Sequence, residues 1–138
     1  MTDSNDVKKV SVIMAHPDDE VLGCGASIAR LAGEGASVHI LIMATGLTSR
    51  DGADAKALDA LKAETKEAAA MLGAASVEFA DFPDNAMDTR AMLHVVKKVE
   101  NFISKNDPDM IFTHHSGDIN IDHNITQRAV LTAARALP

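Results

Sequence analysis

The 138-residue chain has no tryptophan, no tyrosine and only four phenylalanines. Its core must therefore be aliphatic and rich in alanine, and aromatic platforms for stacking a sugar ring are scarce. The chain has a single cysteine, Cys24, so it can form neither an intrachain disulfide nor a CxxC zinc ribbon. A reducing, cytoplasmic setting is the expected location.

Basic residues are also few, with 13 lysines and arginines against 20 acidic residues and a net charge of −7. This balance argues against a nucleic-acid-binding surface. No stretch approaches the ~20 apolar residues that a membrane span requires, and the polar N-terminal residues lack a secretory signal pattern. Since 46% of the residues are hydrophobic and 24% are charged, we expect one globular domain over residues 1–138.

Short apolar runs alternate with helical patterns along the chain. The runs that indicate buried strands are 10–15, 38–43, 77–80 and 110–113. The patterns that indicate helices are 20–32, 56–72, 89–105 and 121–136. In the first helix, Leu22, Ala26, Ala29 and Ala32 or Gly33 recur at helical spacing on one face. The alternation is typical of a Rossmann-like α/β fold, an open and mostly parallel sheet with helices on both faces.

Polar residues gather directly after three of the predicted strands. These clusters are 16–20, 82–85 and 114–123. In an open α/β sheet, ligands bind outside the carboxyl ends of the strands. We therefore expect the three clusters to converge on one site.

The first cluster is His16-Pro17-Asp18-Asp19-Glu20. An aspartate before a helix usually caps it, and that role would explain a single acid. Capping requires neither the histidine nor the additional acids. A helix N-terminus favours ionised carboxylates, which together with a neutral imidazole are what a divalent metal needs.

The last cluster places His123 in the first turn of the final helix. The helix dipole keeps that ring neutral and able to coordinate, and Asp118 or Asp122 could accept a hydrogen bond from a ligand histidine. A solvent-facing capping loop is the alternative interpretation. His114 and His115 are further candidates in the same loop, whereas His39 and His94 receive no role.

The sequence Ala15-His16-Pro17-Asp18-Asp19-Glu20, with the later Asp122-His123 and the turn Phe82-Pro83-Asp84-Asn85, resembles the PIG-L/LmbE-like zinc-dependent N-deacetylases. The resemblance extends over nearly the whole chain. It implies a catalytic zinc ion held by His16, Asp19 and His123, with Asp18 as the general base. Two histidines and one carboxylate leave a coordination position for water, which agrees with that reading.

The activity implied is removal of an acetyl group from an N-acetylated amino sugar or related small molecule, by attack of a zinc-bound water on the amide carbonyl. The expected catalytic residues are Asp18, Asn120 and Asp122, and the expected substrate-binding residues are Asp84 and Arg50. Asn120 stands where some family members carry a histidine, and Leu61 stands where many carry an arginine.

Family members usually continue beyond the helix that follows the second motif, so the resemblance implies that the C-terminal part typical of the family is lacking. Apolar surface left exposed there could favour a homo-oligomer. Two other functions remain open from the residues alone. One is a non-catalytic α/β module that binds a metal or small ligand, and the other is a magnesium-dependent phosphoryl-transfer protein that uses the aspartates.

Overall fold

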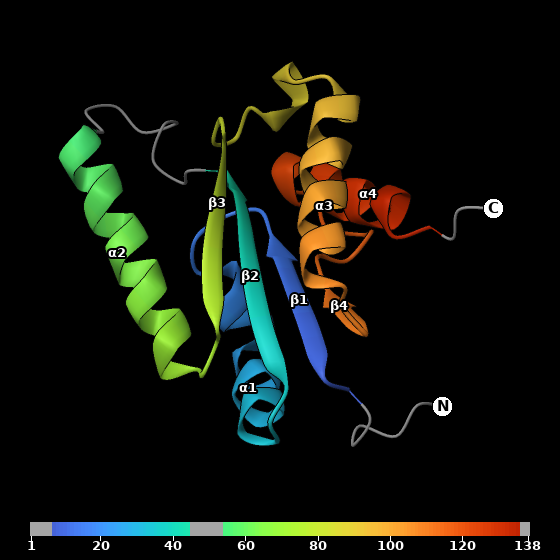
Figure 1. Ribbon diagram of the computed structural model, residues 1–138. Coiled ribbons are helices and arrows are strands. Elements are labelled where there is room, and N and C mark those ends of the chain that lie inside the picture. The colour runs from blue at the N-terminus through green and yellow to red at the C-terminus, as the bar shows by residue number, and fades with distance from the viewer. Residues whose placement is uncertain (1–6, 45–53, 136–138) are drawn as a thin grey trace.

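The computed structural model describes residues 7–44 and 54–135. Strands and helices alternate along these residues (Figure 1). The strands are β1 (Lys9–Met14), β2 (Ser37–Ala44), β3 (Ser76–Phe82) and β4 (Met110–Phe112). The helices are α1 (Asp19–Gly33), α2 (Ala55–Met71), the short 3₁₀ helix η2 (Met87–Thr89), α3 (Met92–Asn106) and α4 (Ile121–Ala133).

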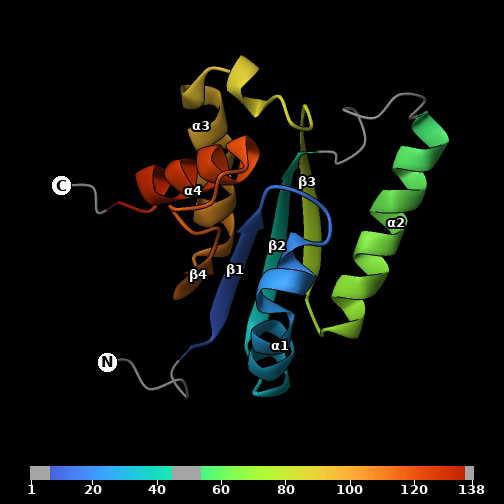
Figure 2. The same cartoon turned by 180° about the vertical axis from the view of Figure 1, so that it is seen from behind.

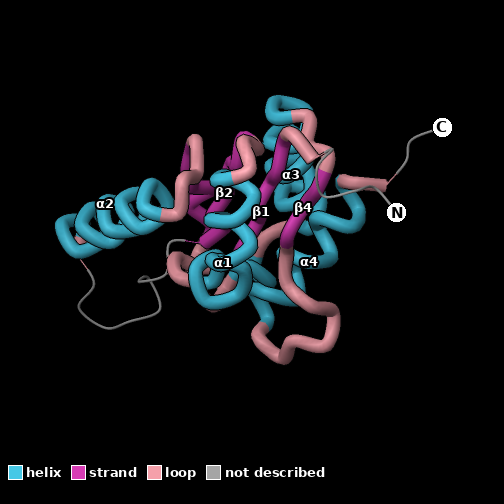
Figure 3. Tube along the Cα trace, turned by 90° about the horizontal axis from the view of Figure 1, so that it is seen from below, coloured by secondary structure: helices cyan, strands magenta, loops and turns pink. Residues whose placement is uncertain are grey.

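The described strands form one parallel sheet in the order β3-β2-β1-β4. The register aligns Val12 of β1 with Ile40 of β2 on one side and with Phe112 of β4 on the other. Each crossover carries a helix, as parallel neighbours require. Figure 3 shows α2 and β4 at opposite ends of the molecule, with a loop leading from β4 to α4.

Helices cover both faces of the sheet (Figure 2). On one face, Val10 and Val12 of β1 pack in a cluster with Ile28 of α1 and Ala69 of α2. The opposite cluster joins Ile13 of the same strand to side chains of α3 and α4. Strands buried on both faces read as continuous apolar runs, which is why the pattern predicted a parallel sheet. The predicted fold class is confirmed.

The apolar stripe that predicted the first helix is not the face that α1 buries. Leu22 is 80% exposed, and the helix instead buries Gly25, Ile28 and Leu31. Cys24 has a non-helical backbone, with φ −145° and ψ 20°, so the first turns of α1 are rotated relative to the rest. As a result, the larger aliphatic side chains of α1 face the sheet, whereas the apolar side chains of its first turn point toward solvent.

The third predicted helix also begins later than expected. Thr89 belongs to η2, and its hydroxyl donates to the Ala86 carbonyl at 2.7 Å. A hydroxyl bonded to a nearby carbonyl competes with helix formation, so α3 starts at Met92. Among the described helices, none combines the length and the hydropathy that crossing a bilayer requires.

Candidate metal centre

The turn between β1 and α1 is shaped by Asp18. Its backbone is left-handed, with φ 102°, and its carbonyl accepts from the amides of Val21 and Leu22 at 3.0 and 2.9 Å. The Asp18 side chain forms no capping hydrogen bond with α1, and the residue is exposed. A left-handed aspartate is uncommon and costs conformational energy. Capping therefore does not account for Asp18.

Glu20 supports this turn from inside the protein. Its residue is 1% exposed, and its Oε2 accepts a hydrogen bond from the Asp18 amide at 3.1 Å. Burial raises the pKa of the Glu20 carboxyl. Because the hydrogen bond joins backbone to a buried side chain, Glu20 helps to fix the left-handed conformation of Asp18.

The N-terminus of α4 is capped by Asn120. Its Oδ1 accepts from the amides of Asp122 and His123 at 2.9 and 3.2 Å. Asp118 in turn accepts from the Asn120 amide at 2.9 Å. An asparagine at this position satisfies helix N–H groups that have no partner within the helix. The cap thus fixes the first turn of α4, which carries both Asp122 and His123.

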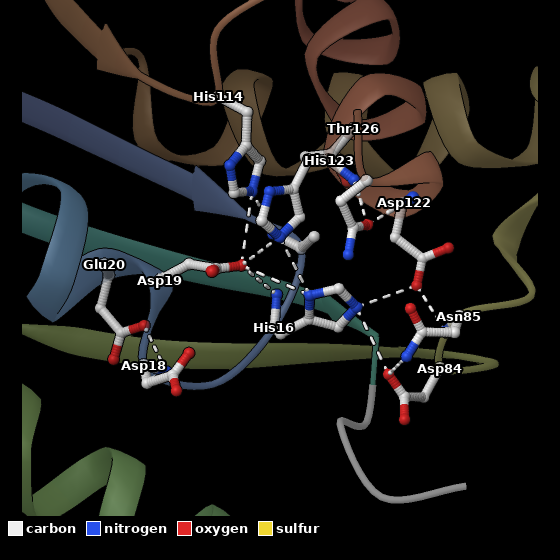
Figure 4. A network of polar contacts seen from close by, with 12 residues as sticks. His16, Asp18, Asp19, Glu20, Asp84, Asn85, His114, Asp122, His123 and Thr126 are labelled. Atoms are coloured by element: carbon white, nitrogen blue, oxygen red, sulfur yellow. Dashed lines mark hydrogen bonds and ion pairs between the residues drawn. The ribbon is translucent and has the colours of Figure 1, made fainter. Parts of the chain in front are cut away.

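Three donor atoms from these two turns meet at one point (Figure 4). His16 Nδ1 lies 3.2 Å from His123 Nε2 and 3.5 Å from Asp19 Oδ2. His123 Nε2 lies 3.2 Å from the same Asp19 oxygen. The predicted ligand set His16, Asp19 and His123 is thus brought together from positions more than 100 residues apart.

The dimensions of this triangle suit a tetrahedral metal ion. Zinc binds imidazole nitrogen and carboxylate oxygen at about 2.0–2.2 Å, so two ligand atoms of a tetrahedral site lie about 3.3–3.5 Å apart. The observed separations of 3.2 to 3.5 Å fit those edges. Three protein ligands leave the fourth position of such a site for water or substrate.

Each histidine of this triangle is held by a carboxylate on its other ring nitrogen. His16 Nε2 lies 2.9 Å from Asp122 Oδ2, and His123 Nδ1 lies 2.8 Å from Asp118 Oδ2. A carboxylate behind a histidine fixes its tautomer and leaves the opposite nitrogen for the metal. Hydrogen bonds from the Asn120 amide and from His123 lower the pKa of Asp118, so it is ionised at neutral pH.

Asp122 is fully buried and accepts two backbone hydrogen bonds. They come from the amides of Asn85 at 2.7 Å and Met87 at 3.1 Å. Burial alone would raise the pKa of Asp122, but its hydrogen bonds with His16 and these amides lower it. The loop after β3 therefore positions the carboxylate that holds His16.

The surroundings of His16 favour positive charge. Burial lowers the pKa of His16, but hydrogen bonds and charges of Asp122 and Asp19 outweigh burial and raise it to about 10. Asp84, whose side chain is 3% exposed, places Oδ1 3.3 Å from His16 Nε2. A proton or a metal cation on this imidazole is stabilised by the same carboxylates.

His114 supports the centre without joining it. Its Nε2 accepts a hydrogen bond from the Ala15 amide at 2.8 Å, and its ring stacks on His123 at 3.9 Å with 13° between the planes. Burial and the neighbouring His123 lower the pKa of His114 to about 4. Stacked parallel rings direct their nitrogen lone pairs in parallel rather than to one point, which disfavours a metal shared by His114, Asp118 and His123.

The remaining predicted residues are distributed as follows. His115 is exposed and accepts from the Gly117 amide at 3.0 Å. Asp84, predicted to bind substrate, is buried against His16. Arg50 lies outside the described residues. Sequence reasoning missed Glu20 as a support and the backbone amides of the loop after β3, and no residue-type signal marks a backbone donor.

A family model described as PIG-L, GlcNAc-PI de-N-acetylase, matches residues 11–134. The chain belongs to the PIG-L family. The resemblance inferred from the sequence is thereby confirmed. An Escherichia coli PIG-L-type relative, named uncharacterized deacetylase YaiS, is 32% identical over 146 residues, which cover all of this chain and 74% of the relative.

Solved structures agree with the PIG-L assignment. N,N'-diacetylchitobiose deacetylase from Pyrococcus horikoshii aligns with a TM-score of 0.82 and 25% identity, covering 93% of this chain and 49% of its own. GalB, a 4-carboxy-2-hydroxymuconate hydratase from Pseudomonas putida, aligns with a TM-score of 0.80 and 29% identity, covering 91% and 55%. The chain thus spans about half the length of these two proteins.

Proposed function

We propose that this protein is a zinc-dependent N-deacetylase, a hydrolase acting on an N-acetylated amino sugar or related small molecule. The observation that carries the proposal is the triangle of His16, Asp19 and His123, whose edges suit a tetrahedral metal ion. The deacetylases among the relatives support the reaction type.

In this proposal His16, Asp19 and His123 hold the zinc ion. Zinc would supply Lewis acidity, which polarises a carbonyl and lowers the pKa of water to about 7. Iron or cobalt could use the same ligands, because first-row metals share a preference for imidazole. Asp118 and Asp122 position the two histidines through contacts with the ring nitrogens that face away from the triangle.

Asp18 is the proposed general base. It takes a proton from the attacking water, whose oxygen bonds to the acetyl carbon, and it returns the proton to the amine nitrogen as the C–N bond breaks. The products are acetate and a free amine. Asn120 and Asp122, predicted as catalytic from the sequence, act here as positioning residues through the cap of α4 and through His16.

Arg50 stays a prediction for anchoring the substrate. Asp84, predicted as substrate-binding, is buried against His16, so in this proposal it positions that histidine and does not contact the substrate. A cytoplasmic location and a homo-oligomer also stay predictions.

A hydratase is the second candidate, because GalB shares the fold at 29% identity. Its named substrate carries a carboxyl group. Asp18 and Glu20 line the space next to the proposed centre, and among the described residues no lysine or arginine lines that space, so it offers an anion no cationic partner there. The described residues thus favour the deacetylase over the hydratase.

The test is acetate release from N-acetylglucosamine derivatives by the zinc-loaded protein. Asp18→Asn should retain zinc and lose about 10²- to 10⁴-fold in kcat, the usual contribution of a general base. Asp59→Asn, the same change at an exposed position of α2, is the matched control and should match wild type.

Equal activity of Asp18→Asn and wild type would refute the base assignment. Zinc binding without acetate release from any derivative would indicate a binding module instead. Metal affinity that survives loss of both histidines would indicate the oxygen-only site of a magnesium-dependent protein.

A further inference from the structure

The outer side of α4 and the residues directly before it carry exposed apolar side chains. Figure 2 shows α4 on the outside of the molecule next to α3. One side of the helix packs against η2, α3 and β1. On the side away from these contacts, Ile121 is 54% exposed and Leu131 is 61% exposed, and Ile119 before the helix is 98% exposed. Of the seven large hydrophobic residues that are exposed in the described part of the chain, three therefore lie in this one segment.

These side chains surround a shallow hollow of about 420 Å³ on the outer side of α4. Three isoleucines line it, and Leu131 lies three residues beyond the lining residue Arg128, on the same side of the helix. Single exposed apolar residues are common, but a contiguous apolar patch with a polar rim marks an interaction site. The α4 surface is defined here as the residues that line the hollow, together with Leu131: Asp88, Asp118, Ile119, Ile121, Asn124, Ile125, Arg128 and Leu131.

The α4 surface also carries two opposite charges that lack partners. Asp88 of η2 and Arg128 of α4 both line the hollow, and both are exposed. Within residues 7–44 and 54–135, neither side chain forms an ion pair or a hydrogen bond, with the other or with any third group. Asp118, the remaining charged residue of the surface, is bound to His123 at 2.8 Å and to the Asn120 amide at 2.9 Å. A patch that offers an acid and a base beside apolar side chains is complementary to a second copy of itself.

We propose that the α4 surface is the interface of a homodimer, in which two copies of the chain pack about a two-fold axis. In such an interface the same surface serves both copies, so the pairing of Asp88 in one copy with Arg128 in the second copy occurs twice. The isoleucines form the apolar centre, and a composition of aliphatic residues with arginine is typical of interfaces. The inference is independent of the proposed function, because it uses none of the residues of the His16, Asp19 and His123 triangle.

Sedimentation equilibrium of the wild-type chain is the first measurement. A dimer dissociation constant below about 100 μM is expected, because a small interface with two ion pairs gives modest affinity. A chain that stays monomeric at about 200 μM would overturn the proposal.

Charge reversal tests the pairing itself. Arg128→Asp and Asp88→Arg each bring like charges together in the dimer, so each should weaken self-association at least about tenfold. An equimolar mixture of the two variants should associate again, because both pairs then join opposite charges. Self-association that neither variant weakens, or a mixture that associates no better than the separate variants, would overturn the assigned interface.

The apolar centre is tested by Ile121→Glu. Ile121 is the first residue of α4, where a helix N-terminus accepts an acidic side chain without cost to the helix. Burying this charge in the dimer should weaken self-association at least about tenfold. Met71→Glu, at an 84% exposed position of α2, is the matched control and should leave the dissociation constant within about twofold. Equal weakening by Ile121→Glu and Met71→Glu, or weakening by Met71→Glu alone, would contradict the α4 surface as the interface.

Discussion

Two histidines in this fold, His16 and His39, each contact polar partners through both ring nitrogens, with opposite consequences. His39 lies in β2 with Nε2 2.9 Å from Ser37 Oγ and Nδ1 2.8 Å from Ser76 Oγ. His16, after β1, has Asp122 on one nitrogen, while the other faces Asp19 and His123. The serine hydroxyls tie His39 into the sheet, whereas His16 directs one nitrogen to a point that Asp19 and His123 share.

The comparison shows that the chemistry available to a histidine depends more on its polar partners than on how deeply the ring is buried. Serine hydroxyls are neutral and adjust as donors or acceptors, so they hold a ring without favouring charge on it. Carboxylates favour a cation on the ring and fix which nitrogen carries the proton. Substitutions of the partners of His16 and of His39 should therefore differ in their effects on stability and on metal affinity.

The largest expected effect is on folding. Asp122→Ala would leave His16 and the amides of Asn85 and Met87 without their buried acceptor. We expect it to lower the free energy of unfolding of metal-free protein by about 3–5 kcal/mol, as for other broken buried pairs. Urea unfolding measures the change. Ser76→Ala, at His39, should cost only about 0.5–1.5 kcal/mol.

Equal losses in Asp122→Ala and Ser76→Ala would show that the carboxylate and hydroxyl partners are equivalent, contrary to the comparison.

A smaller effect is expected on metal affinity. Asp118→Asn keeps the shape of the side chain but weakens the hydrogen bond that holds His123. Loss of such a supporting carboxylate typically costs 10- to 100-fold in metal affinity, so we expect a change of about that size in zinc titrations. Ser37→Ala, which removes a partner of His39, should leave zinc affinity within about twofold. A comparable loss of zinc affinity in Ser37→Ala would contradict the difference inferred between the two kinds of histidine partner.

The smallest effect concerns acid stability at the amino end of the sheet. The Asp109 carboxylate accepts from the amides of Lys8 and Lys9 at 2.9 and 2.8 Å, and these hydrogen bonds lower its pKa. A carboxyl whose pKa is lowered in the folded state stabilises the protein above its ordinary pKa, and this contribution is lost as the pH falls.

Unfolding measured from about pH 6 to about pH 3 should therefore show wild type and Asp109→Asn converging as the pH falls. A difference that stays constant over this range would exclude the carboxylate as its source.

Much of the fold was predictable from the sequence because the two central strands, β1 and β2, are buried on both faces. Runs such as 38–43 are short, apolar and rich in β-branched residues, which favours buried strands, and their alternation with helical patterns favours a parallel sheet. The orientation of α1 was not predictable, because it depends on the backbone at Cys24. A pattern of ideal helical spacing does not anticipate such a break.

The residues of the triangle could be predicted, but the contacts that hold them in place could not. Residues at strand ends of a parallel sheet converge, so the clusters 16–20 and 114–123 could be expected to meet, whereas the set His16, Asp19 and His123 was implied by the resemblance to the PIG-L/LmbE-like family. The contacts that hold them depend on loop geometry. His114 accepting from the Ala15 amide, and the amides of the loop after β3 binding Asp122, arise only once the sheet is assembled.

The most direct measurement is the zinc content of purified wild type, His16→Ala and His39→Ala. About one zinc ion per chain is expected in wild type and in His39→Ala, and almost none in His16→Ala, because only His16 contributes to the triangle. Equal zinc in wild type and His16→Ala, or loss of zinc in His39→Ala alone, would contradict the account.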